Sequence, residues 1–169
     1  GEIPGSTETA AQYFAYSEGE GGVAITGYNI EGGTDVVIPS EIDGKKVVAI
    51  ADYAFTTNGI TPTSINNTKK VMPSYLYNDN KASVHKLKTA SPRGLGITSV
   101  VIPNTVTTIG VNAFYGNKLT TIVIPSSVTS IGDSAFEGNQ LTSITLSDGV
   151  ESIGGSAFDD NQLTEVVIP

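Results

Sequence analysis

Apolar residues in the second half of the chain recur with a fixed period of 22 positions. Residues 97–118, 119–140 and 141–162 align without gaps, and each adjacent pair of these segments shares 12 of its 22 positions. Residues 163–169 begin a fourth copy. Such a period is typical of repeat proteins in which each copy forms one coil and buries its apolar side chains against the neighbouring coils. We therefore predict a stack of coils that share one core.

The order of apolar positions within a copy predicts a short strand followed by a return path. In the copy 119–140, residues 120–124 are rich in β-branched side chains, which favours a strand. Pro125 ends this strand because proline has no N–H to donate. Val128 and Ile131 begin the return path, and Phe136 closes the coil. Strands at the same position of successive copies are expected to pair in parallel, about 4.8 Å apart.

The first half of the chain divides into three further segments. Residues 36–60 form a lengthened first copy, because Val37-Ile38-Pro39 and Ala54-Phe55 match landmarks of the later copies. Within residues 1–35, two apolar stretches flank a glycine-rich turn. Residues 61–96 contain no clear copy and form either an insertion or a degenerate coil. We expect one continuous domain.

Two positions keep one residue type in successive copies. Gly110, Gly132 and Gly154 follow the isoleucine of the return path, where the first copy has Ala51. Alanine resists a positive φ angle, so close backbone packing explains this position better than a left-handed conformation. An asparagine three residues after each phenylalanine is expected to donate its amide to the backbone of its own turn and of the neighbouring coil. This predicted structural ladder comprises Asn58, Asn117, Asn139, Asn161, Phe55, Phe114, Phe136 and Phe158.

The shared pattern L-T-x-I-x-I-P-x-x-V-x-x-I-G-x-x-A-F-x-x-N resembles the BspA-like, or Treponema-type, leucine-rich repeat of bacterial surface proteins. The match is close over residues 97–169 and holds with one insertion over residues 36–59. Many relatives have cysteine at the ladder asparagines, which changes the ladder chemistry and should leave the fold unchanged. The resemblance implies a mainly β repeat solenoid, with short parallel strands in a right-handed leucine-rich-repeat coil, and an extracellular or cell-surface location in a bacterium. It also implies that residues 1–35 contain a β-hairpin cap, without which the first coil would expose a strand edge and its core.

Residues 61–96 carry six of the nine basic residues of the chain. Within this segment, residues 71–77 and 83–87 could pair as a hairpin. Two interpretations stay open: a protrusion that binds a partner, since insertions project from one face of a solenoid, or a solvated loop whose charges offset the acidic coils. The candidate partner-binding residues of this segment are Tyr75, Tyr77, His85, Lys86 and Lys88.

The predicted strands offer a second candidate surface, because alternate residues of a strand point away from the core. This surface combines small hydroxyl and β-branched side chains with little charge. It either binds another protein's extended surface, as leucine-rich repeats generally do, or carries threonine and valine only because strands favour them. Its candidate partner-binding residues are Val101, Thr121, Val123, Ser143 and Thr145.

The composition narrows the function classes. Among 169 residues, 38% are hydrophobic, 15% are charged and 19 are glycine, which suits a turn-rich β fold. The formal charge of −8 argues against nucleic acid, whose phosphates are bound by clustered lysine and arginine. The chain contains no run of 18 apolar residues, so the sequence predicts no membrane-spanning helix. The absence of cysteine leaves the redox compartment open.

Little in the sequence supports catalysis. His85 is the only histidine, and no serine lies in a nucleophile elbow, so neither a catalytic triad nor a zinc site is expected. The pair Asp159-Asp160 lacks the ligand spacing of an EF-hand loop. We predict no catalytic residue, no metal and no cofactor. The expected function is recognition or adhesion through a protein or glycan ligand, and the alternative is a passive spacer in a larger cell-surface protein.

The last residues of the chain lead to a prediction about how the stack of coils ends. The chain stops directly after the apolar segment Val167-Ile168-Pro169, without a polar cap. Because the end coils of solenoids need caps, we expect the native protein to continue beyond this point. An uncapped last strand also predicts end-to-end self-association of the chain.

Overall fold

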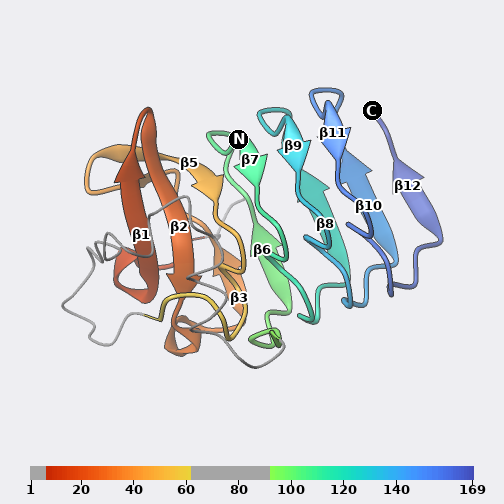
Figure 1. The fold of residues 1–169 in the computed structure, drawn as a ribbon, viewed down its shortest axis with the longest axis horizontal. Helices are drawn as coiled ribbons and strands as arrows, with labels where there is room; N and C mark the ends of the chain where they lie inside the picture. Colours follow the sequence, from red (N-terminus) through yellow and green to blue (C-terminus); the bar gives the residue numbers. More distant parts are fainter. Residues whose placement is uncertain (1–6, 62–91) are drawn as a thin grey trace.

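The chain folds into the predicted stack of coils (Figure 1). The structure is a computed structural model that describes residues 7–61 and 92–169. Within those residues the regular elements are β-strands and two short 3-10 helices, η1 (Ala11–Tyr13) and η2 (Ile30–Gly32). The fold is a mainly β solenoid with parallel strands, which confirms the fold class predicted from the repeats.

One wall of the solenoid contains the predicted strand of every copy. We call it the strand wall; it consists of β3 (Asp35–Val37), β6 (Ser99–Val101), β8 (Thr121–Ile124), β10 (Ser143–Leu146) and β12 (Glu165–Val167). β3 pairs in parallel with β6, and β10 pairs in parallel with β8 and β12. Residues 22 positions apart are partners in β8 and β10, as Ile122 and Ile144 show. The period in the sequence therefore sets the register of the sheet formed by β8, β10 and β12.

A second wall, the return wall, was not predicted. Its strands are β5 (Lys45–Ile50), β7 (Thr108–Ile109), β9 (Ser130–Ile131) and β11 (Ser152–Ile153), which pair in parallel with one another. Three of these strands are only two residues long, which is too short for an alternation of apolar and polar residues to reveal them. They exist because stacking places the same backbone groups of successive coils opposite one another.

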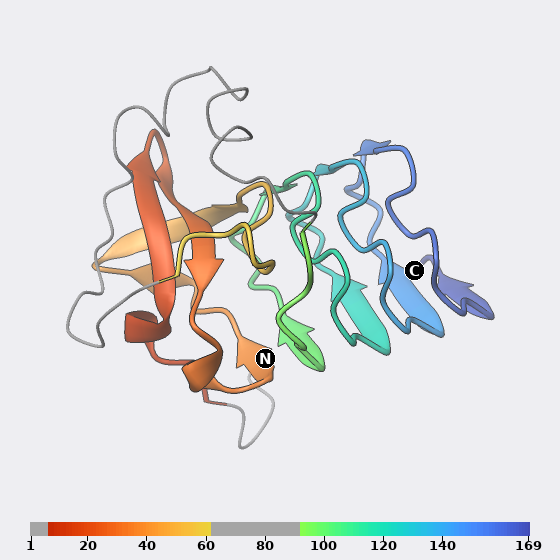
Figure 2. The ribbon, with the colours of Figure 1, turned by 60° about the horizontal axis from the view of Figure 1, so that its bottom comes forward.

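The N-terminal cap has two parts, one for each wall (Figure 2). The predicted hairpin is present as β1 (Phe14–Gly19) and β2 (Gly22–Tyr28), and β2 pairs in parallel with β5, so the hairpin covers the return wall. The strand wall is closed by Thr9, whose backbone N–H donates to Val37 O at 2.9 Å. Thr9 Oγ1 accepts from the Val37 N–H at 2.9 Å. Both backbone groups of Val37 are thereby satisfied.

The extra residues of the first copy form a small hairpin. β4 (Glu41–Ile42) pairs antiparallel with the start of β5. Asp43 and Gly44 connect the two strands with φ angles of 54° and 75°. Two successive positive φ angles at Asp-Gly are typical of the type I′ turn that suits the twist of a two-residue hairpin. The insertion therefore lengthens one turn of the coil without disturbing the sheet that follows.

A column of aromatic rings runs through the core between the two walls. Phe55, Phe114, Phe136 and Phe158 stack in order, with centroid distances of 4.7, 5.2 and 5.4 Å and nearly parallel planes. The cap extends this column through Tyr28 and Phe14, at 5.5 and 5.1 Å. Each coil therefore contributes one ring to a continuous stack, and the hairpin shields its N-terminal end.

The repeated glycine is required by close packing. A Cβ atom on Gly132 would lie 2.6 Å from the backbone nitrogen of Val111 in the preceding coil. Similar clashes arise at Gly110 and Gly154, and none of the three has a left-handed φ angle. The preference for steric packing over positive φ is confirmed. A left-handed residue does occur two positions later, at Asn112, Ser134 and Ser156.

The first copy is the direct neighbour of the copy 97–118 in both walls. β3 pairs with β6, β5 pairs with β7, and Phe55 stacks on Phe114. The chain on either side of residues 62–91 also lies together: Thr57 N–H donates to Arg93 O at 2.8 Å, and Arg93 N–H donates to Thr57 Oγ1 at 3.1 Å. Most of residues 61–96 lies outside the described residues, so the choice between an insertion and a degenerate coil stays a prediction.

Candidate functional site

The outward side of the strand wall, which we call the strand face, presents two parallel rows of side chains. Each row takes one residue from every strand, because side chains alternate between the core and the outside along a strand. One row is β-branched and consists of Val37, Val101, Val123, Thr145 and Val167. The second is polar and consists of Asp35, Ser99, Thr121, Ser143 and Glu165.

The β-branched row is unusually exposed for apolar side chains. Val101, Val123 and Val167 expose 46%, 62% and 40% of their surface. By contrast, Ile122 and Ile124, which flank Val123 on β8, point inward and expose 2% and 0% of their surface. The alternation therefore follows the predicted pattern, and Val101 and Val123 form an exposed apolar pair on adjacent strands, flanked by the half-buried Val37 and Thr145.

Carboxylates stand at both ends of the polar row, with hydroxyl groups between them. Asp35 Oδ1 accepts hydrogen bonds from the Ser99 and Thr98 hydroxyls at 2.8 and 3.0 Å. These bonds hold the carboxylate on the strand face. Glu165 occupies the corresponding position on β12 and is exposed.

The structure places the predicted strand-face residues together. Thr121, Val101 and Val123 are exposed, whereas Ser143 and Thr145 are half-buried. Asp35 and Val37 also belong to this surface, although the sequence did not lead us to predict them. The alignment of Val37-Ile38-Pro39 with Val101-Ile102-Pro103 contains the signal that would have found them. Tyr75, Tyr77, His85, Lys86, Lys88 and the possible hairpin of residues 71–87 lie outside the described residues.

The asparagines of the ladder have a structural role in every described coil after the first. Asn139 is buried. Its Nδ2 donates to Phe136 O at 3.0 Å and to Phe114 O of the preceding coil at 2.9 Å. Its Oδ1 accepts from the Leu119 N–H, at the start of its own copy, at 3.1 Å. One side chain therefore closes a coil and ties it to its neighbour.

Asn117 and Asn161 form the equivalent bonds. Asn117 Nδ2 donates to Phe55 O and Phe114 O, and its Oδ1 accepts from the Leu95 and Ile97 N–H groups. Asn161 Nδ2 donates to Phe136 O and Phe158 O, and its Oδ1 accepts from the Leu141 N–H. For Asn58 the structure shows the backbone N–H donating to Thr56 Oγ1, and the ladder role of its side chain stays a prediction.

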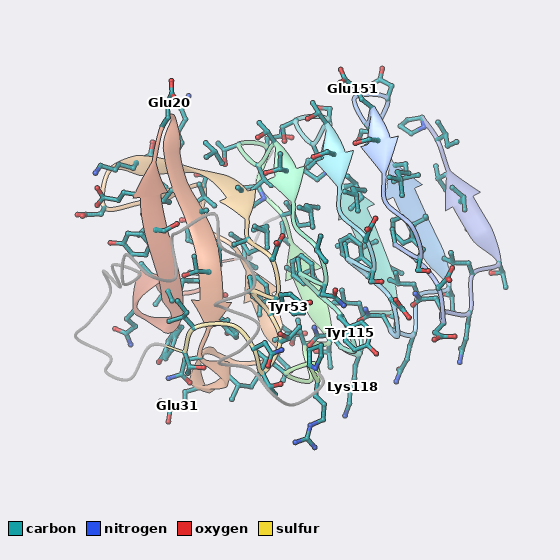
Figure 3. The ribbon with its side chains drawn as sticks, in the orientation of Figure 1. Glu20, Glu31, Tyr53, Tyr115, Lys118 and Glu151 are labelled. Atoms are coloured by element: carbon teal, nitrogen blue, oxygen red, sulfur yellow. The ribbon has the colours of Figure 1, made fainter. Side chains whose placement is uncertain are left out.

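Titratable groups are dispersed along the solenoid. Glu20 and Glu151 lie at one edge and Tyr115 and Lys118 at the opposite edge (Figure 3). Burial, followed by the charge of Asp52, raises the pKa of Tyr53. In the described part of the chain, no three histidine or acidic side chains are grouped so that they could hold a metal ion. The same residues contain no helix long and apolar enough to cross a membrane.

Comparison with known families decides the nature of the coils. Residues 93–169 match the family described as "BspA type Leucine rich repeat region (6 copies)". The chain carries a BspA-type leucine-rich repeat region. The match covers the copies whose ladder and aromatic column are described above, and it confirms the resemblance inferred from the residues. No curated protein matches the chain.

Two solved structures support the fold of the whole chain, including the part outside the BspA-type region. A leucine-rich repeat protein of T. pallidum, TpLRR, aligns with a TM-score of 0.56 and 23% identity, over 95% of this chain and 71% of that one. A leucine-rich repeat protein from Bacteroides capillosus aligns with a TM-score of 0.52 and 19% identity, over 89% of this chain and 88% of that one. At these identities the likeness shows a common fold.

Proposed function

We propose that this chain is a non-enzymatic recognition module that binds a protein or glycan through its strand face or through residues 61–96. Leucine-rich-repeat solenoids typically serve as interaction modules, and the family match is consistent with that role. The proposal includes a bacterial extracellular or cell-surface location, which rests on the family resemblance. A role in adhesion follows from the same location.

The exposed β-branched row carries the proposal. Exposed apolar side chains that lie side by side at one repeat position are candidate interaction sites. Val101 and Val123 occupy the same repeat position, and their exposure of 46% and 62% is high beside the 8% and 2% of their inward neighbours Val100 and Ile122. A partner that covered this row would remove apolar surface from water, which stabilises a complex by about 25 cal/mol per Å².

The first experiment is a search for ligands with a glycan array and a panel of purified proteins, followed by face variants. Thr121→Arg and Thr145→Arg place long charged side chains on the strand face, and we expect them to abolish binding of a ligand that uses this face. Thr108→Arg is the matched control, because Thr108 is an exposed threonine of a strand in the return wall. Equal binding by the face variants and the control, with the fold intact, would exclude the strand face.

A passive spacer is the alternative function. The aromatic column and the asparagine bonds repeat without interruption from coil to coil, as a stiff rod requires. A spacer would bind nothing in the ligand search and would tolerate added coils. A ligand whose binding is lost in Thr121→Arg would therefore argue against a purely passive role.

Self-association of this 169-residue chain is a separate part of the proposal. β12 pairs with β10 on one side; Val166 within β12 and Ile168 directly after it expose 50% and 71% of their surface. Unpaired strand edges of this kind template pairing with another chain. Light scattering should show concentration-dependent dimers that Val166→Lys weakens. A strictly monomeric chain at millimolar concentration would refute this part.

A further inference from the structure

We infer that the strand face binds a positively charged polypeptide, with lysine or arginine side chains lying along its β-branched row, and not a glycan. This inference rests on the proposed function and specifies the chemistry of its partner. It follows from the side chains that the face contains, from those that it lacks, and from the charge of the surrounding coils.

The two rows of the strand face fit the two parts of a lysine or arginine side chain. Such side chains bury their aliphatic stems along apolar surface while their charged heads stay in water. Val101 and Val123 offer exposed apolar surface on adjacent strands. The carboxylates of Asp35 and Glu165 stand in the neighbouring row, where a charged head could reach them. Stem and head therefore both find a complementary group.

The charge of the coils favours the same partner. Of the 17 acidic side chains in the chain, 15 lie in the described residues, against 4 of the 9 basic ones. None of those four basic residues lies on a strand of the strand wall. A net negative charge raises the association rate of cationic ligands and repels anionic ones. Repulsion of this kind disfavours acidic polypeptides and sulfated or carboxylated glycans.

The strand face also lacks the groups that bind neutral sugars. The five strands of the strand wall contain no aromatic residue on which a sugar ring could stack. They contain no asparagine, glutamine or arginine either, so no planar amide or guanidinium group is present to contact two vicinal hydroxyl groups at once. Valine, threonine and serine instead provide a shallow surface suited to aliphatic side chains.

The size of the strand face sets the expected affinity. Five strands about 4.8 Å apart, each three residues of about 3.3 Å, cover roughly 240 Å². A stable protein interface buries about 800 Å² on each partner. The strand face alone should therefore bind weakly, so the test needs a method that detects weak binding and locates it on the molecule.

The experiment is an NMR titration of the isotopically labelled 169-residue chain with three probes. The first is a twelve-residue peptide of alternating lysine and valine, the second has glutamate in place of lysine, and the third is the neutral oligosaccharide chitohexaose. We expect the lysine peptide alone to shift the amide signals of β6, β8 and β10, with little change in β7, β9 and β11. Raising the salt concentration should weaken this binding.

Charge variants at one position provide the quantitative test. Thr121→Lys should lower the affinity for the lysine peptide about fivefold, and Thr121→Glu should raise it by about the same factor. Thr108→Lys and Thr108→Glu make the same charge changes on the return wall and should leave the affinity nearly unchanged. Amide signals remote from the substitution report whether each variant keeps its fold.

The outcomes separate this inference from the proposed function. Shifts on the strand face caused by chitohexaose or the glutamate peptide, and not by the lysine peptide, would overturn the inference and leave a binding face in place. Equal shifts on both walls, or equal effects at positions 121 and 108, would mean general charge attraction and would also overturn it. The absence of any shift overturns the inference, whereas the proposed function depends on the ligand search and the arginine variants.

Discussion

At the scale of single residues, the ladder asparagines link the coils through buried hydrogen bonds. Each amide satisfies backbone groups that a tight bend leaves without partners, and an unsatisfied buried group costs about 1–3 kcal/mol. Asn139 bonds to three such groups, which belong to Leu119, Phe114 and Phe136. The side chain is therefore expected to matter more for stability than its small size suggests.

Asn139→Asp tests the ladder. The carboxylate keeps an acceptor for the Leu119 N–H but removes the donor that serves Phe114 O and Phe136 O, so we expect the free energy of unfolding to fall by about 3–5 kcal/mol at pH 7. Below about pH 4 the protonated carboxyl group can donate again, and the deficit relative to the unaltered chain should shrink. Urea unfolding at both pH values measures this. Gln140→Glu, an exposed change of the same charge, should have little effect.

Tyr28 predicts a loss of stability at high pH. Burial, followed by the charge of Tyr13, raises the pKa of Tyr28 from 10.0 to about 12, and its hydroxyl donates to Gly33 O at 2.8 Å. The folded chain therefore holds this proton more tightly than the unfolded chain. Its contribution to stability is complete below pH 10 and is lost as the pH rises towards 12. Denaturant unfolding between pH 8 and 11.5 should show this decline, and Tyr28→Phe should reduce it.

At the scale of elements, the short strands depend on their neighbours. A two-residue strand such as β7 cannot persist alone, and it forms because β5 and β9 offer backbone partners on both sides. The same dependence makes the first strand of each wall vulnerable. The hairpin β1–β2 protects the return wall, and Thr9 protects β3.

Thr9→Val tests the cap of the strand wall. The substitution preserves the shape of the side chain but removes the oxygen that accepts from the Val37 N–H. We expect a loss of about 1 kcal/mol and faster hydrogen exchange at the Val37 amide. Thr7→Val, at an exposed residue two positions earlier, is the control. Equal exchange rates at Val37 in both variants would show that Thr9 does not cap β3.

At the scale of the whole molecule, stability is a sum over coils and their interfaces. A single coil has no neighbour to bury its apolar side chains, whereas an internal coil such as 119–140 buries Leu119, Val128 and Phe136 completely. Added internal coils should therefore stabilise the stack.

Duplication of residues 119–140 tests this expectation. The inserted coil would meet the same neighbours as the original one, with its glycine, asparagine and phenylalanine in register. We predict a higher free energy of unfolding and a larger denaturant m value, because more surface is buried. Guanidinium unfolding followed by circular dichroism measures both quantities. A lower midpoint, or a separate early transition, would contradict the additive description.

The sequence by itself determined the properties that belong to a single coil. The period, the inward isoleucines, the steric need for Gly132, the bonds of Asn139 and the alignment of Phe114 with Phe136 all follow from residue order within 22 positions. The residue order within one copy suffices because each coil packs against another copy of itself, so the pattern of one coil also predicts the side chains that its neighbour presents to it. The exposed row containing Val101 and Val123 was predictable for the same reason.

Only the tertiary structure decided the features that depend on distant parts of the chain. The return wall forms when coils stack, the β1–β2 hairpin joins it in parallel through β5, and Thr9 closes the other wall from 28 residues away. The contact of Thr57 with Arg93 likewise joins residues 36 positions apart. These contacts form no pattern along the chain, since their partners are brought together by the closure of the coils and not by local spacing.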